Sequence, residues 1–192
     1  MKVLQAIELF MIEQSFRGNS KYTIEYYKIA LELFEKWLKS DEVESLDIIT
    51  YKKYVMYLQS QNIKSTSVNS YTRAVKAFYN YLIDEDIIPD ISNKLRLSKA
   101  IRQVIEPLTD EEIQILISSL RGDTRLDKRN ICIVLLMLDS GLRRSEVLRL
   151  QLSDVNLNTG MLIVNGKGNK QRFVPMGINT RNAVVEYVNY YR

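Results

Sequence analysis

The sequence of 192 residues contains no histidine and only one cysteine. Without histidine the chain cannot form a Ser-His-Asp or Cys-His catalytic arrangement, and a single cysteine also excludes the common zinc-ligand sets. Cys132 has no partner for an internal disulfide. Because it lies within the apolar run 131–138, we expect a small buried side chain in a protein of a reducing compartment.

Glycine and proline are scarce, with seven and three residues, and no apolar run approaches the roughly 20 residues that a membrane-spanning helix needs. The N-terminus breaks into an amphipathic pattern, unlike a signal peptide. With 46% hydrophobic and 26% charged residues, the composition is typical of a soluble, helix-rich protein with a real core. These features predict a cytoplasmic protein without a membrane segment.

Excess positive charge is also small. Before Glu106 there are 15 basic and 13 acidic residues, and from Glu106 onward there are 12 and 10, so both halves carry about +2. Any binding of nucleic acid must therefore come from local basic faces rather than from bulk charge.

Apolar residues recur at helical spacing in four stretches of the first ninety residues. They predict helices from 3 to 16, from about 21 to 39, from Thr50 to about 60, and from Ser65 to about 84. Leu4 is expected on the buried face of the first helix, and Thr50 and Ser65 are expected to cap the third and fourth. The sequence thus predicts a compact four-helix domain over residues 1–88.

Residues 89–106 show no clear periodicity and are predicted to be a basic linker. Its basic residues are Lys94, Arg96, Lys99 and Arg102. The second domain, 107–192, opens with a helix that Thr109 and Glu112 cap as a capping box. A buried helix from about 128 to 139 follows.

Between residues 154 and 175 the apolar period changes to that of short strands. Turn residues at 158–160 and 166–169 separate three such strands, and a last helix is predicted from 180 to 191. The expected fold class is mainly α with a small antiparallel sheet.

Two motifs in this second domain suggest a binding or catalytic role. In Gly141-Leu142-Arg143-Arg144-Ser145-Glu146 a helix stops, turns on glycine and restarts, so Arg143 offers a fork of donors suited to phosphate oxygens. Glu146, one turn beyond, is placed to brace a cation. In Gly166-Lys167-Gly168-Asn169-Lys170 a basic tip follows a predicted strand. It is not the phosphate-binding loop of ATPases, because Gly168 stands where that loop has Ser or Thr.

Together with Val174-Pro175, these motifs resemble in order and spacing the front half of the catalytic domain of tyrosine recombinases, the phage integrase family. The likeness is to Xer-type recombinases and to integrases of phages and conjugative transposons. It implies that Arg143 is the first catalytic arginine and that Lys167 is the lysine on the β-hairpin, with Lys170 a possible rival. Arg144 and Arg172 are candidate phosphate contacts.

By the same resemblance, residues 1–88 are the helical core-binding, SAM-like domain. Its candidate DNA-binding residues lie at the starts and outer faces of the second and fourth helices: Lys21, Tyr22, Thr23, Lys28, Lys64, Thr66, Asn69, Arg73 and Lys76. For any single one of them, an ordinary solvated helical face is an equally good interpretation. The basic linker could likewise follow a DNA backbone or simply aid solubility.

The resemblance implies double-stranded DNA as the partner, strand transfer through a phosphotyrosine, and no metal or nucleotide cofactor. It also implies a tetramer on DNA for the full-length protein, with a monomer expected for this chain, in a bacterial host or encoded by a phage. The family's His/Lys-x-x-Arg box and nucleophilic tyrosine are not found in these residues. Tyr187, Tyr190 and Tyr191 follow the hairpin too soon to be the nucleophile.

We therefore expect a chain that binds DNA but is catalytically incomplete. The alternatives are a naturally truncated, non-catalytic DNA-binding or regulatory relative of a recombinase, and a helical protein-interaction module without salt-dependent affinity for DNA.

Overall fold

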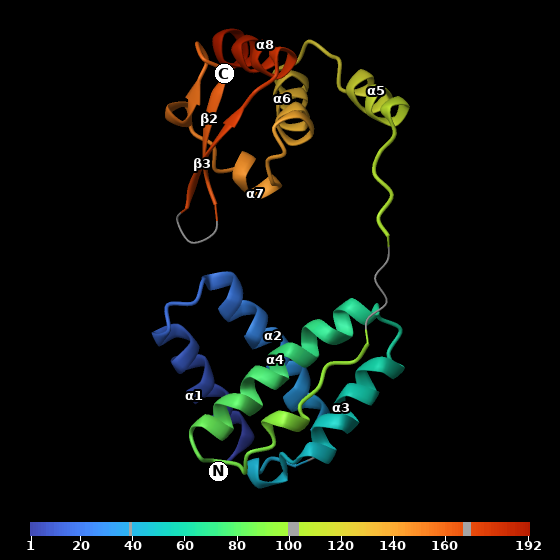
Figure 1. The fold of residues 1–192 in the computed structure, drawn as a ribbon, viewed down its shortest axis with the longest axis vertical. Helices are drawn as coiled ribbons and strands as arrows, with labels where there is room; N and C mark the ends of the chain where they lie inside the picture. The colour runs from blue at the N-terminus through green and yellow to red at the C-terminus, as the bar shows by residue number, and fades with distance from the viewer. Residues whose placement is uncertain (39, 100–103, 167–169) are drawn as a thin grey trace. The chain divides into compact units, whose positions relative to one another are not determined.

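The computed structural model describes residues 1–38, 40–99, 104–166 and 170–192. They form two compact units, Met1–Val104 and Ile105–Arg192, each with its own hydrophobic core (Figure 1). The predicted fold class, mainly helical with a small antiparallel sheet, is confirmed. None of the helices in these described ranges is long and apolar enough to cross a membrane.

Among its described residues, the first unit is built from four helices close to the predicted positions. Their bounds are α1 Val3–Phe16, α2 Lys21–Trp37, α3 Ile48–Ser60 and α4 Ser65–Asp84, with 3-10 turns η1 Val43–Ser45 and η2 Ser92–Lys94. Helix α4 is the centre of this unit, because α1, α2 and α3 all contact it.

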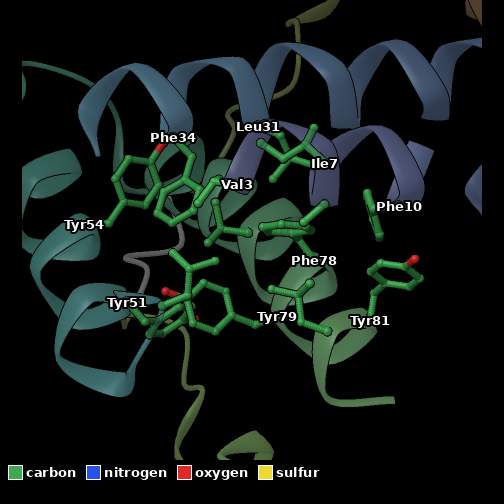
Figure 2. Close-up of a cluster of buried hydrophobic side chains, with 14 of the residues drawn as sticks. Val3, Ile7, Phe10, Leu31, Phe34, Tyr51, Tyr54, Phe78, Tyr79 and Tyr81 are labelled. Atoms are coloured by element: carbon green, nitrogen blue, oxygen red, sulfur yellow. The ribbon is translucent and has the colours of Figure 1, made fainter. Parts of the chain in front are cut away.

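The core of the first unit is aromatic. Phe10, Phe34, Phe78 and Tyr79 are completely buried and converge between the helices (Figure 2). Phe10 meets Phe78 edge-on with ring centroids 5.7 Å apart, and Phe34 meets Tyr54 in the same way at 4.8 Å. Aromatic pairs in this geometry contribute about 0.5–1.5 kcal/mol beyond the area they bury. These contacts fasten α1 to α4 and α2 to α3.

Three local predictions in this unit are wrong. Leu4 is 56% exposed, because Val3 takes the inner position one residue earlier. Helix α3 begins at Ile48 with Asp47 as its N-cap, and the Asp47 carboxylate accepts the backbone N–H of Thr50 at 2.7 Å. Ser65 is the first residue of α4 rather than its cap, which is Lys64 without a side-chain hydrogen bond.

The segment after α4, predicted to be a linker from residue 89, lies against the first unit as far as residue 98. Leu95 is 1% exposed and belongs to the first core. The Tyr51 hydroxyl donates a hydrogen bond to the carbonyl oxygen of Arg96 at 3.1 Å. The chain therefore continues along the helices instead of leaving them at residue 89.

The second unit combines helices with a three-stranded antiparallel sheet, as predicted. Its elements are α5 Asp110–Ser119, α6 Arg125–Asp139, α7 Arg144–Val147, η3 Leu152–Asp154, β1 Val155–Asn156, β2 Met161–Asn165, β3 Gln171–Pro175, α8 Ile178–Glu186 and a π-helical turn η5 Tyr187–Tyr191. The strand order is β1-β2-β3. The predicted capping box is also present, since Thr109 and Glu112 exchange hydrogen bonds at the start of α5.

The core of the second unit lies between the sheet and the helices α6 and α8. Strand β2 turns Leu162 and Val164 inward, with exposed fractions of 0% and 2%. The prediction that the helix from about 128 to 139 is buried is wrong, because only Cys132 and Leu136 of α6 are buried and Met137 and Leu138 are each 39% exposed. Helix α6 therefore presents one narrow stripe to the core.

Candidate active site and nucleic-acid interface

The motif with Arg143 forms a sharp corner between α6 and α7. After α6 ends at Asp139, Gly141 adopts a φ of +61°, a left-handed conformation that a residue with a side chain adopts only with strain. The next residue, Leu142, is 3% exposed and anchors the corner in the second core. Arg143 then stands as the N-cap of α7, in extended backbone conformation. The corner is therefore fixed on both sides of the arginine.

The backbone of Arg143 is hydrogen-bonded to Glu146, but most of its side chain extends into solvent. Its backbone N–H donates to Glu146 Oε2 at 2.8 Å, and its guanidinium Nη1 donates to Glu146 Oε1 at 3.1 Å. The side chain is nevertheless 76% exposed. Most of the guanidinium donors are thus directed toward solvent, where a phosphate oxygen could accept them.

Glu146 is the buried anion of this corner, with its side chain 6% exposed. Arg172 binds it with both terminal nitrogens, Nη1 to Oε1 at 2.8 Å and Nη2 to Oε2 at 2.9 Å. The hydrogen bonds from Arg172, followed by the one from the Arg143 backbone, lower the pKa of Glu146 to about 2. Glu146 is ionised at neutral pH, which confirms the expected role of bracing a cation and makes it unsuitable as a general acid.

Arg172 does not present its guanidinium as the sequence led us to expect. Both terminal nitrogens donate to Glu146, so these two donors are engaged inside the protein and the phosphate contact stays a prediction. The same guanidinium approaches the base of the hairpin, since a Cβ added to Gly166 would lie 3.8 Å from Arg172 Nη1. The Gly166 N–H donates to the Lys170 carbonyl at 2.8 Å and closes that base.

The remaining candidates of this unit divide into described and undescribed residues. Arg144 and Lys170 are exposed, as a binding role requires. Lys167 lies outside the described residues, as do its neighbours Gly168 and Asn169. Over the described ranges, no group of three or more histidine, cysteine, aspartate or glutamate side chains could hold a metal ion.

In the first unit, α2 and α4 present neighbouring exposed edges. The Tyr26 hydroxyl on α2 donates to the carbonyl of Ser70 on α4, which joins the two helices near their N-terminal ends. One helical turn before each of these residues stand Tyr22, which is 79% exposed, and Thr66, which is also exposed. The candidates that the structure leaves exposed are Lys21, Tyr22, Lys28, Lys64, Thr66 and Arg73.

Two acidic residues lower the positive potential of part of this surface. Lys21 and Lys28 alternate with the exposed acidic residues Glu25 and Glu32 on the outer face of α2, which lowers the local positive potential. Thr23 is half-buried, and its hydroxyl lies 2.9 Å from that of Ser20 at the helix N-cap.

Asn69 and Lys76 must be removed from the predicted DNA-binding face. Asn69 is 5% exposed, its Nδ2 donates to the Ser98 carbonyl at 2.9 Å, and its Oδ1 accepts from the Ser98 hydroxyl at 2.8 Å. Lys76 Nζ donates to the carbonyl of Leu95 at 2.7 Å. Both side chains hold the segment that follows α4 against that helix.

Sequence reasoning missed one basic cluster in this unit. A hollow of about 560 Å³ between α3 and the segment after α4 is lined by Lys52, Lys94 and Arg96, with Met56 and Leu97 at its apolar wall. Lys52 was not a candidate, because a single lysine on the outer face of a helix is an ordinary solvated residue. Only the packing of residues 93–98 brings the three cations together.

Comparisons with known proteins agree with the two-unit division. The family model described as the phage integrase N-terminal SAM-like domain matches residues 8–86, and the model described as the phage integrase family matches residues 106–191. The tyrosine recombinase XerC of Lacticaseibacillus casei is 30% identical over 196 residues, covering 98% of this chain and 64% of that protein. XerC of Halalkalibacterium halodurans is 30% identical over 178 residues, covering 90% and 58%. The chain thus spans about three fifths of the length of these relatives.

Solved structures share the fold of the whole chain. The Tn1549 transposon integrase in complex with circular intermediate DNA has a TM-score of 0.76 at 20% identity, covering 100% of this chain and 66% of that chain. A lambda integrase dimer bound to a COC′ core site has a TM-score of 0.76 at 15% identity, covering 97% and 69%.

Proposed function

Because the chain belongs to the phage integrase family of tyrosine recombinases, we propose that it forms part of a site-specific recombinase or integrase that acts on double-stranded DNA. The whole protein cuts and rejoins strands through a phosphotyrosine intermediate, in the cytoplasm of a bacterium. Residues 1–192 by themselves bind DNA without cleaving it, because the family's His/Lys-x-x-Arg box and nucleophilic tyrosine are not found among them.

The observation that carries this proposal is the exposed guanidinium of Arg143 beside the base of the hairpin. A phosphodiester under attack by a hydroxyl passes through a crowded state with extra negative charge on its non-bridging oxygens. Arg143, braced by a buried carboxylate and open to solvent, is suited to bind those oxygens as the charge builds. Removing one such preorganised donor costs on the order of 3–4 kcal/mol in an enzyme.

Lys167 is proposed as the general acid that protonates the leaving 5′ oxygen, a contribution of roughly 10²–10⁴-fold. In the sequence it stands between Gly166 and Lys170, whose backbones are joined at the hairpin base. Arg144 and Lys170 are proposed as further phosphate contacts.

The first unit is proposed to contact the DNA backbone with the exposed edges of α2 and α4. Arg73 and Thr66 share the narrow exposed stripe of α4, since they lie seven residues, or about two turns, apart. Lysine, arginine, threonine and tyrosine are side chains that contact phosphate and sugar. Two units that each contact DNA also explain why neither half needs a large net charge.

Salt-dependent DNA binding tests the proposal. We expect log K for duplex DNA to fall linearly with log salt concentration, and Arg73→Ala and Arg143→Ala each to reduce the slope by about 0.9, as the loss of one phosphate contact requires. On a suicide substrate the chain should give no covalent protein–DNA adduct. The absence of any salt-dependent affinity for duplex DNA would exclude the DNA-binding role, and an adduct would contradict the proposed catalytic incompleteness.

A non-catalytic regulator that occupies recombination sites is the second candidate. Both candidates predict that the chain binds DNA. They differ in the activity of the whole protein, because a regulator would form no covalent protein–DNA adduct even with Lys167 and Arg143 intact. We propose that the chain alone is a monomer in solution and that the whole protein forms a tetramer on DNA, which sedimentation with and without DNA can test.

A further inference from the structure

The position of Arg172 in strand β3 determines the direction of its side chain. In β3 it pairs with Val164 of β2, a residue 2% exposed, and its side chain is less exposed than those of its neighbours Gln171 and Phe173. Side chains alternate between the two faces of a strand, so Arg172 and Val174 share the face that turns toward the core. An arginine at such a position needs an internal partner, and Glu146 supplies it.

The carboxylate of Glu146 is saturated by this arrangement. It accepts two hydrogen bonds from Arg172, one from the Arg143 guanidinium and one from the Arg143 backbone. An ionised carboxylate has about four lone-pair sites, so all of its accepting capacity is used. One buried anion is thereby shared between two arginines of unequal exposure, 40% for the Arg172 side chain and 76% for that of Arg143.

We propose that Arg172 is a positioning residue, which fixes the carboxylate of Glu146 and through it the direction of the Arg143 guanidinium, and which does not itself bind phosphate. This inference rests on the proposed function of Arg143. Arg172 also links the Arg143 corner to the sheet, because it stands on β3 and its guanidinium binds Glu146 of α7.

The geometry of the pair favours this role over a phosphate contact. To bind a phosphate with the two nitrogens that hold Glu146, Arg172 would have to release a bidentate partner whose side chain is 6% exposed. Glu146 would then keep only its two hydrogen bonds from Arg143, and loss of a partner from a buried ion pair is unfavourable. A lysine could not replace it, because an ammonium group cannot hold both carboxylate oxygens in one plane. Arg172→Lys therefore preserves the charge and removes only the alignment.

A double-mutant cycle on duplex DNA affinity separates the two roles. If Arg172 acts through Arg143, Arg172→Lys lowers the affinity at least about twofold in the parent chain, the lower limit for coupled residues of one network, and has no effect when Arg143→Gln is present. If Arg172 contacts phosphate itself, its effect persists in the Arg143→Gln background, and the proposal is wrong. Arg149→Lys, at an exposed arginine just after α7, is the matched control and should change nothing.

A second measurement does not depend on DNA. NMR titration of the Glu146 side-chain carboxyl carbon should give a pKa of about 2 in the parent chain, and Arg172→Lys should raise it toward the ordinary value of 4.5 and shift the Arg143 Nε–Hε signal. Arg149→Lys should do neither. An unchanged Glu146 titration or an unmoved Arg143 signal would overturn the proposal.

The two tests also separate this inference from the proposed function. If the parent chain binds no DNA, the proposed function fails, and the NMR titration alone decides whether Arg172 aligns Arg143. If DNA binds with the expected salt dependence but the cycle is additive, the proposed function stands and the positioning role is rejected. If Arg172→Lys unfolds the second unit, Arg172→Gln repeats the comparison, because its amide NH2 can donate to a Glu146 oxygen but cannot form the bidentate pair.

Discussion

At the scale of single residues, the first core contains tyrosines in two different situations. The hydroxyls of Tyr54 and Tyr79 are buried with no hydrogen-bond partner among the described residues. Tyr51 is equally buried, but its hydroxyl donates to the Arg96 carbonyl. Burial raises the pKa of all three, that of Tyr51 to about 12, so none ionises near neutral pH. The rings stabilise the core, whereas an unpaired hydroxyl opposes its own burial.

The contrast predicts opposite effects for the same substitution. Tyr79→Phe removes an unpaired polar group and should leave the free energy of unfolding unchanged or raise it by up to about 1–2 kcal/mol. Tyr51→Phe leaves the Arg96 carbonyl without its donor and should lower it by about 1 kcal/mol. Urea unfolding followed by the fluorescence of Trp37, the only tryptophan, measures both. Equal losses would indicate that the Tyr79 hydroxyl has a partner after all, such as an ordered water.

At the scale of elements, the segment after α4 is held by Asn69 and Lys76, two side chains that the sequence suggested as DNA contacts. Asn69→Ala removes both bonds to Ser98 and should destabilise the first unit by about 1–2 kcal/mol without changing the DNA affinity of the folded protein. Arg73→Ala, four residues along the same helix, should have the opposite pattern. Its free energy of unfolding should stay within about 0.5 kcal/mol of that of the parent chain, and its affinity for DNA should fall. A folded Asn69→Ala variant with weakened DNA binding would restore Asn69 to the binding face.

Sequence periodicity predicted the elements because each reflects a local pattern. The four helices, the three strands and the Arg143 corner all depend on residues within one or two turns of each other, and Glu146 lies only three residues from Arg143. Arg172 lies 26 residues from Glu146, and Asn69 lies 29 from Ser98, so neither contact leaves a periodic signal. A basic or amide side chain near a helix start or hairpin therefore suggested binding to DNA, although the structure uses it to join distant segments.

At the scale of the whole molecule, the two units differ in the size of their cores. Among the described residues, nineteen buried side chains make up the first core and seven make up the second. Since apolar burial is the main stabilising term in folding, the second unit should be the less stable of the two.

This difference predicts that unfolding is not a single transition. Trp37 reports on the first unit, and Cys132, buried against the Ala183 carbonyl with its pKa raised to about 11 by burial, reports on the second through thiol labelling. Labelling of Cys132 should begin at a urea concentration where Trp37 fluorescence is still native. Leu162→Ala, at a completely buried position of the second core, should lower its stability by about 2–5 kcal/mol and shift only the labelling midpoint. Coincident midpoints that Leu162→Ala moves together would mean that the two cores fold as one cooperative unit, because a cavity in one can destabilise the other only through coupling between them.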